Sequence, residues 1–220
     1  MNPLFDFLNR LAANNDRPWF QAHKAEFDGL RDRWFADIDR LIAACSAWEP
    51  QYTYLSGKDS TFRIYRDTRF SPDKTPYKTF FSAALTPRGK SAPMAGFYIS
   101  AGVNPDQCGI FGGMWCPDRD QLRKMRHAIV DNIEEFSAIV EGIDATGLYG
   151  DWCGDKLKTI PKGWERDHPQ APYLRLLHYG REHAVTPDFF ADPAWPERAA
   201  EIMRPLKPLN DFINYSLFEE

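Results

Sequence analysis

The sequence predicts an α+β protein in which an antiparallel meander sheet is covered by a long N-terminal helix and by C-terminal helices. Apolar side chains recur every three to four residues over 17–46, as on a helix that packs one face on a core. After residue 50 the apolar side chains alternate every second residue, which is typical of strands. Short turns join these strands and favour antiparallel neighbours, because parallel neighbours need long crossovers.

The N-terminal part is predicted to be helical. Leu4, Leu8 and Leu11 follow helical spacing, and the Asn-Asn-Asp sequence before Pro18 is typical of a helix start, where proline is tolerated in the first turn. The helix over 17–46 must cover a sheet face, so apolar residues of both are expected in one core. The predicted core residues are Phe27, Trp34, Ile38, Phe97 and Ile99.

The sheet is predicted from four segments with strand-like alternation, 62–66, 78–86, 95–103 and 107–115. Residues 104–106 read Asn-Pro-Asp, a typical turn, between the third and the fourth of them.

The C-terminal half is predicted to consist mainly of helices. The expected helical segments are 118–132, 134–141, 172–177 and 195–218, and a short strand is expected at 182–186. Pro205 and Pro208 should interrupt the last helix, because proline removes a backbone donor. The chain contains no repeat or linker that divides it, so we expect a single domain over residues 1–220.

Composition narrows the class of protein. Hydrophobic residues make up 43% and charged residues 26%, which are ordinary globular values. The formal net charge of -4 makes nucleic acid an unlikely main partner, because phosphate backbones are held by clustered cations. The sequence has neither a basic leader with an apolar stretch nor an apolar run of about 20 residues, so no membrane segment is expected. The 4 cysteines form no CxxC pair, which favours free thiols in a cytoplasmic protein.

The segment 62–81, FRIYRDTRFSPDKTPYKTFF, concentrates charge and rigid backbone. It holds three arginines and two lysines against two aspartates, and Pro72 and Pro76 restrict the loop between its ends. Preorganised guanidinium and ammonium groups are suited to bind phosphate or carboxylate. The predicted ligand-binding residues are Arg63, Arg66, Asp67, Arg69, Lys74, Tyr77 and Lys78.

Two residues of this segment carry specific expectations. In a strand, Arg66 would fall on the apolar side with Phe62, Ile64 and Phe70, where a guanidinium needs a carboxylate or an anionic ligand as partner. Neighbouring arginines favour the charged form of Asp67, so this residue is expected to orient an arginine rather than to act as a general base.

Other candidate sites have weaker support. His178, Glu182 and His183 do not match a zinc-binding spacing, so no metal site is predicted. The glycine-rich segments 109–115 and 150–156 do not match phosphate-binding loops. Cys116 and Cys153 are the candidate thiol nucleophiles, without an obvious histidine partner in the sequence. The residues name no reaction, no cofactor and no catalytic group.

Four motifs resemble a known family. They are NNDRPWF at 14–20, the motif at 62–81, FGGMWCP at 111–117 and PKGWERDHP at 161–169. Together they are similar to a widespread bacterial and fungal family of conserved hypothetical proteins, a domain of unknown function, over roughly residues 5–218. The resemblance implies a single domain, and it implies no activity, cofactor or catalytic residue.

Three functions remain open from the sequence. The first is binding of a small anionic or phosphorylated ligand by the cations of 62–81. The second is a non-catalytic interaction or scaffold protein in which those cations form a structural ion-pair lock. The third, single-stranded nucleic-acid binding, is disfavoured by the acidic net charge. Cations that converge on an open cleft favour the first, and an acid opposite each arginine favours the second.

Overall fold

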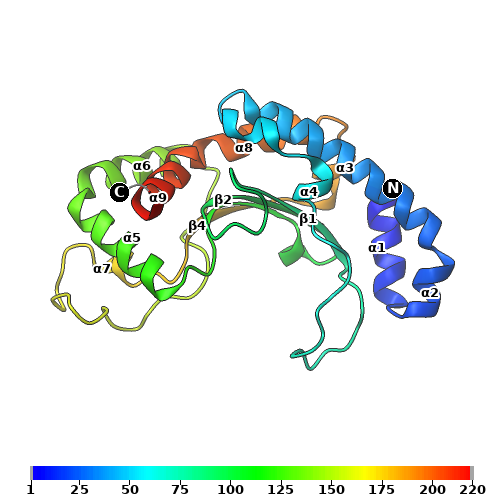
Figure 1. Cartoon of the computed structure of the whole chain (residues 1–220), viewed down its shortest axis with the longest axis horizontal. Helices are drawn as coiled ribbons and strands as arrows, with labels where there is room; N and C mark the ends of the chain where they lie inside the picture. The colour runs from blue at the N-terminus through cyan, green and yellow to red at the C-terminus, as the bar shows by residue number, and fades with distance from the viewer. Residues whose placement is uncertain (1, 219–220) are drawn as a thin grey trace. The chain divides into compact units, whose positions relative to one another are not determined.

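A computed structural model of the chain describes residues 2–218 and has the predicted α+β class. Its four-stranded sheet contains β1 (Phe80–Leu85), β2 (Gly96–Gly102), β3 (Gly109–Met114) and β4 (Tyr179–Ala184) within these residues. The spatial order is β1-β2-β3-β4 with antiparallel neighbours, which confirms the meander. Figure 1 labels β1, β2 and β4 of this sheet and most of the helices. No helix among residues 2–218 is both long and apolar enough to cross a membrane.

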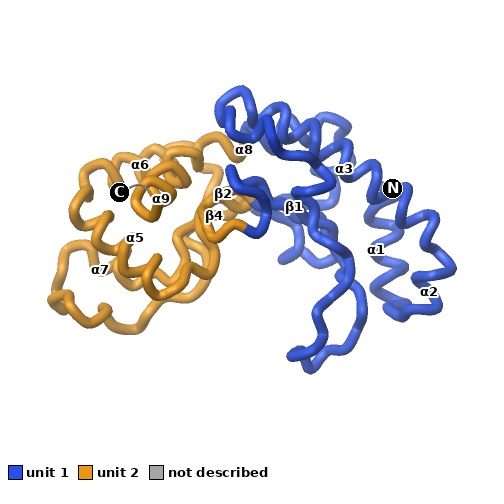
Figure 2. The backbone as a smooth tube through the Cα atoms, in the orientation of Figure 1, with its two compact units in different colours: residues 1–91, 98–110, 184–201 blue, residues 92–97, 111–183, 202–220 orange. Residues whose placement is uncertain are grey.

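The chain folds into two compact units (Figure 2). Unit 1 contains residues 1–91, 98–110 and 184–201, and unit 2 contains residues 92–97, 111–183 and 202–220. The strand β1 lies in unit 1, whereas β2 and β3 each contribute residues to both units. The single domain over 1–220 stays a prediction.

Unit 1 contains the N-terminal helices and α4. Their bounds are α1 Pro3–Ala13, α2 Arg17–Ala22, α3 Lys24–Ser46 and α4 Gly57–Ser60. The single helix predicted over 17–46 is therefore divided at His23, whose backbone (φ -108°, ψ 14°) leaves the helical region. The His23 ring stacks on Trp19 with centroids 3.9 Å apart, and its Nδ1 lies 2.8 Å from the Trp19 carbonyl oxygen. These local contacts stabilise the break.

The prediction of a strand over 62–66 is wrong. This segment meets β1 and the residues before it only through isolated antiparallel bridges, Thr61 with Ala83 and Tyr65 with Tyr77. Between the two bridges the chain advances four residues from Thr61 to Tyr65 but six residues from Tyr77 to Ala83. The pairing register therefore shifts, and no regular ladder forms. Pro76 accepts a hydrogen bond from Arg66 but cannot donate one back. The fourth strand is instead β4.

The predicted core residues are all buried, at 0–6% exposure. On α3, the Trp34 ring lies 5.7 Å from Phe81 of β1 and 5.5 Å from Trp195, the first residue of α8 (Trp195–Met203). Phe27 also lies 5.7 Å from Phe81. The apolar stripe of α3 thus packs on β1, as the helical spacing predicts.

Unit 2 contains the helices that follow the meander. Their bounds are α5 Arg119–Asp131, α6 Ile133–Ala145, α7 Ala171–Leu174 and α9 Lys207–Phe218. A capping box joins Asp118 and Gln121 at the start of α5. The predicted closing helix over 195–218 is interrupted by a 3-10 turn, Arg204–Leu206, so the break at the prolines is confirmed.

Candidate functional site

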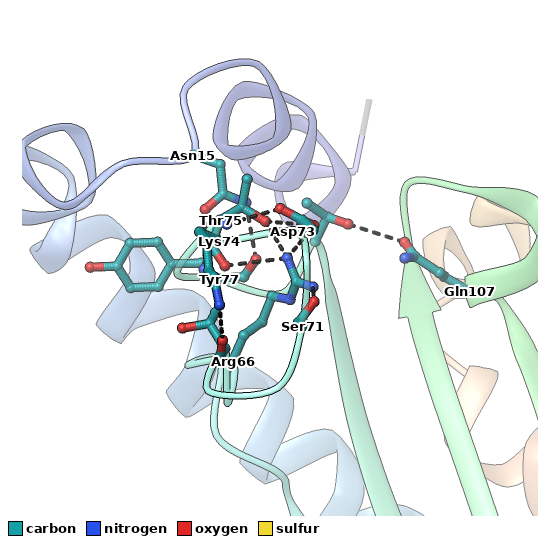
Figure 3. Close-up of polar contacts among 10 residues, drawn as sticks. Asn15, Arg66, Ser71, Asp73, Lys74, Thr75, Tyr77 and Gln107 are labelled. Carbon is teal, nitrogen blue, oxygen red and sulfur yellow. Dashed lines mark hydrogen bonds and ion pairs between the residues drawn. The ribbon is translucent and has the colours of Figure 1, made fainter.

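The loop that follows residue 65 is held together by the Arg66 side chain (Figure 3). Its Nη1 donates to Asp73 Oδ2, to the Thr75 hydroxyl and, at 3.2 Å, to the Thr75 carbonyl oxygen. Its Nη2 lies 3.5 Å from Ser71 Oγ. The Asp73 carboxylate also accepts the Thr75 backbone N–H at 2.9 Å. The Thr75 N–H and then Arg66 lower the pKa of Asp73 to about 2. Arg66 therefore has the carboxylate partner that its position requires.

The outer part of the same loop is exposed and self-paired. Arg69 Nη2 donates to Asp67 Oδ2 at 2.6 Å, and this pair lowers the pKa of the Asp67 carboxyl group. Lys74 Nζ donates to the Thr68 carbonyl oxygen at 2.8 Å. Phe70 is 92% exposed, so its expected place on the apolar side is wrong. The loop turns away before this residue, because Arg66 folds it back toward Asp73.

The end of the loop is fixed by an amide from the N-terminal helices. Asn15, between α1 and α2, donates from Nδ2 to the Tyr77 carbonyl oxygen at 3.0 Å and accepts the Tyr77 N–H at 3.1 Å (Figure 3). The Tyr77 ring stacks on Phe20 at 4.0 Å and is buried, with 2% exposure. Burial raises the pKa of its phenol. Tyr77 therefore acts as a packing residue of this region.

A polar cavity of about 550 Å³ lies beside the loop. Its lining includes Arg66, Asp67, Asp73, Tyr77 and Lys78. Within this lining the Asp73 carboxylate pairs with Arg66, whereas Lys78 has no carboxylate partner among the described residues.

A second cavity, of about 420 Å³, has a different character, and we call it the cationic groove. It lies between α3, α4, the segment 61–65, β1 and Lys90. Its basic lining residues are Lys24, Arg31, Lys58, Arg63 and Lys90. Its ring-bearing lining residues are Phe27, Phe35, Phe62, Tyr65, Phe80 and Phe81. The described lining contains no Asp or Glu.

The cations of the groove differ in their partners. Lys24 and Arg31 share the Asp28 carboxylate, with Arg31 Nη1 2.6 Å from Asp28 Oδ1. Among residues 2–218, Lys58, Arg63 and Lys90 form no ion pair with a carboxylate. The Lys90 ammonium donates to the Thr61 carbonyl oxygen at 2.5 Å. The groove thus keeps positive charge that nearby acids do not cancel.

Lys78 adds a further ammonium group beside the groove. Its Nζ lies 5.5 Å from the Phe62 ring centroid and 5.6 Å from that of Phe80, and both rings line the groove. Burial, and secondly the charge of Arg63, lower the pKa of Lys78. In the described chain it too forms no ion pair with a carboxylate. Two motif cations, Arg63 and Lys78, therefore meet here, whereas Arg66, Arg69 and Lys74 make their contacts in the loop.

Sequence reasoning missed most residues of the cationic groove. Lys58 reaches it because α4 packs on α3, where the Gly57 N–H donates to Asp39 Oδ1 at 2.6 Å. Lys90 reaches it from the connection after β1. Both placements depend on contacts between distant segments. A surplus of cations without nearby acids is the one sequence feature that pointed to this part of the molecule.

The other candidates are placed as follows. Among the described residues, no group of three or more His, Cys, Asp or Glu side chains is arranged to hold a metal ion. His178 Nδ1 accepts the Cys116 backbone N–H at 2.9 Å, a histidine neighbour that the sequence did not reveal. Burial raises the pKa of Cys153 to about 11, so this thiol is poorly suited to act as a nucleophile. His183 Nδ1 lies 2.7 Å from the Leu148 carbonyl oxygen.

The fold and this geometry define an α+β protein with a meander sheet and a cationic groove beside its first strand. The model of the family described as conserved hypothetical protein (DUF2461) matches residues 3–212, so the chain belongs to that family. No curated protein and no solved structure was found to match the chain.

Proposed function

We propose that the protein binds a small anionic or phosphorylated ligand in the cationic groove. The observation that carries the proposal is the half-buried Lys78 beside Arg63, together with Lys58 and Lys90 of the groove lining, because ion pairs within residues 2–218 do not offset these like charges. Such an arrangement costs folding free energy, which a bound anion recovers. The groove is also of the size that small ligands occupy.

The proposal gives different roles to different parts of the motif at 62–81. Arg63 and Lys78 are assigned to the ligand. Arg66 with Asp73, and Arg69 with Asp67, are assigned to an ion-pair lock that shapes the loop. The scaffold hypothesis therefore accounts for the loop, and the ligand hypothesis accounts for the groove.

Binding, rather than a reaction, is what the groove supports. Its polar lining groups are lysine, arginine, tyrosine and threonine, and the described lining contains no His, Cys, Asp or Glu to serve as base or nucleophile. The cytoplasm stays the compartment predicted from the sequence.

The test is ligand-induced thermal stabilisation with inorganic phosphate and pyrophosphate. At about 100 times the Kd, binding stabilises the folded state by roughly 2.7 kcal/mol, which raises the Tm of a protein of this size by roughly 5–10 °C. Arg63→Gln and Lys90→Met should each abolish most of this rise. Arg69→Gln removes a cation of the same motif that lies outside the groove, so the rise in Tm should persist in this variant. The rise should also persist in Arg66→Ala.

Two results would contradict the proposal. One is no rise in Tm with either anion. The other is an equal loss of the rise in Arg69→Gln and Arg63→Gln, since this would indicate a diffuse charge effect rather than a site.

A further inference from the structure

The walls of the cationic groove are more apolar than a site for inorganic phosphate requires. Phe35, Phe62 and Phe80 are half-buried, and Tyr65 is 45% exposed. Free phosphate is held by backbone N–H groups and cations, and it gains nothing from aromatic walls. Pockets for organic ligands, in contrast, combine apolar and aromatic walls with a few polar groups. The ring content of the groove therefore bears on which ligand it takes.

Two lysine ammonium groups without an ion-pair partner among the described residues lie near the Phe62 ring. The ammonium of Lys78 lies 5.5 Å, and that of Lys90 5.7 Å, from its centroid. An anion held by either lysine therefore lies next to the Phe62 ring. A group attached directly to that anion is then in reach of the ring walls, where a flat ring stacks favourably.

The size of the groove limits the ligand. A volume of about 420 Å³ lies in the lower part of the range that small-ligand sites span. A phosphate joined to one ring system fits this range, whereas a long polymer would need a continuous basic surface. The formal net charge of -4 also disfavours a polynucleotide.

Resting on the proposed function, we infer that the ligand of the cationic groove is an aromatic phosphate: a phosphate monoester carried by a flat aromatic or heteroaromatic ring system no larger than a nucleoside. The phosphate contacts Arg63, Lys78 and Lys90, and the ring stacks among Phe62, Phe80 and Tyr65.

The test compares two probes with the same charged group, methyl phosphate and phenyl phosphate, by isothermal titration of the full chain. Phenyl phosphate should bind at least about fivefold more tightly, the lower end of the range for stacking on an aromatic side chain. Phe62→Leu should remove this preference and leave the affinity for methyl phosphate within about twofold, because leucine keeps the apolar volume and removes the ring. Phe70→Leu is the matched control, since that ring is 92% exposed in the same motif and lies outside the groove lining.

The outcomes separate this inference from the proposal on which it rests. Equal affinities of the wild-type protein for the two probes would overturn the aromatic ligand and leave anion binding standing. Binding of neither probe would overturn both. A twelve-residue oligothymidylate that binds more than about 100-fold more tightly than phenyl phosphate would replace the small ligand by single-stranded nucleic acid. If Phe62→Leu fails to fold, the comparison of the two probes on the wild-type protein decides.

Discussion

Two glycines of unit 1 should respond with opposite sign to the same substitution by alanine. A Cβ at Gly57 would lie 2.1 Å from the Phe35 carbonyl oxygen and 3.1 Å from the Asp39 backbone nitrogen. Both atoms belong to the backbone of α3, so neither can rotate away. A Cβ at Gly29, an exposed position in the second turn of α3, would meet no atom within 4 Å.

The expected magnitudes follow from these contacts. Overpacking costs about 1–3 kcal/mol, and the hydrogen bond from the Gly57 N–H to Asp39 adds about 1 kcal/mol if it breaks. We therefore expect Gly57→Ala to lower the free energy of unfolding by about 3 kcal/mol and the Tm by about 6–12 °C. Gly29→Ala should raise the free energy of unfolding by about 0.5–1 kcal/mol, because alanine has the higher helix propensity.

Urea unfolding followed by circular dichroism, together with a thermal scan, measures both changes. If Gly57→Ala lowers the free energy of unfolding by less than about 0.5 kcal/mol, α4 can move away from α3 with little loss of stability. A destabilised Gly29→Ala would contradict the exposed helical position. Gly57→Ala should also weaken phosphate binding, because α4 carries Lys58 into the cationic groove.

Three further predictions concern other parts of the chain. Trp34→Ala should lower the free energy of unfolding in urea by on the order of 3 kcal/mol. This is the lower end for a buried aromatic residue, because the indole borders a cavity of about 100 Å³. A decrease below about 0.5 kcal/mol would contradict the place of Trp34 in the core. The carboxyl signal of Asp73 should titrate in NMR near its pKa of about 2, so its contribution to loop stability is present above about pH 4 and is lost as the pH falls through 2. In Arg66→Ala the midpoint should rise but stay below 3.8, since the Thr75 N–H remains; an unchanged midpoint would show that the pair does not form in solution. At pH 8, iodoacetamide should modify the exposed Cys116 well before Cys153, whose pKa of about 11 leaves little thiolate; equal rates in peptide mass spectrometry would contradict this burial.

The parts of the fold that could be predicted depend on short-range patterns. The stripe on α3, the alternation in β1 and β2, and the prolines around the start of α9 each act within a few residues, so the sequence displays them directly. The break at His23 was missed because it depends on a ring stacked on Trp19, which the apolar spacing does not register.

The candidate site could be predicted only in part, for a similar reason. The need of Arg66 for a partner was visible in the sequence, and Asp73 of the same motif supplies that partner. The division between a loop held by ion pairs and a groove with unpaired charge was not visible, since it depends on which way each side chain points from an irregular segment. Lys58 and Lys90 come from outside the motif, and no spacing connects them to it.

The irregular pairing of residues 61–66 also has a consequence for self-association. β1 stands at one end of the sheet order, and the exposed backbone of an edge strand can recruit a strand from another molecule. Here the Phe62 N–H donates to the Ser82 carbonyl oxygen at 2.9 Å, and the Lys78 N–H donates to that of Ile64 at 2.8 Å. The segment thus occupies edge positions of β1 and of the residues before it without becoming a flat strand, and it places Arg63 on its exposed side. A second molecule that approached this edge would meet a bent backbone that carries the charged Arg63 side chain, which is a poor template for aggregation.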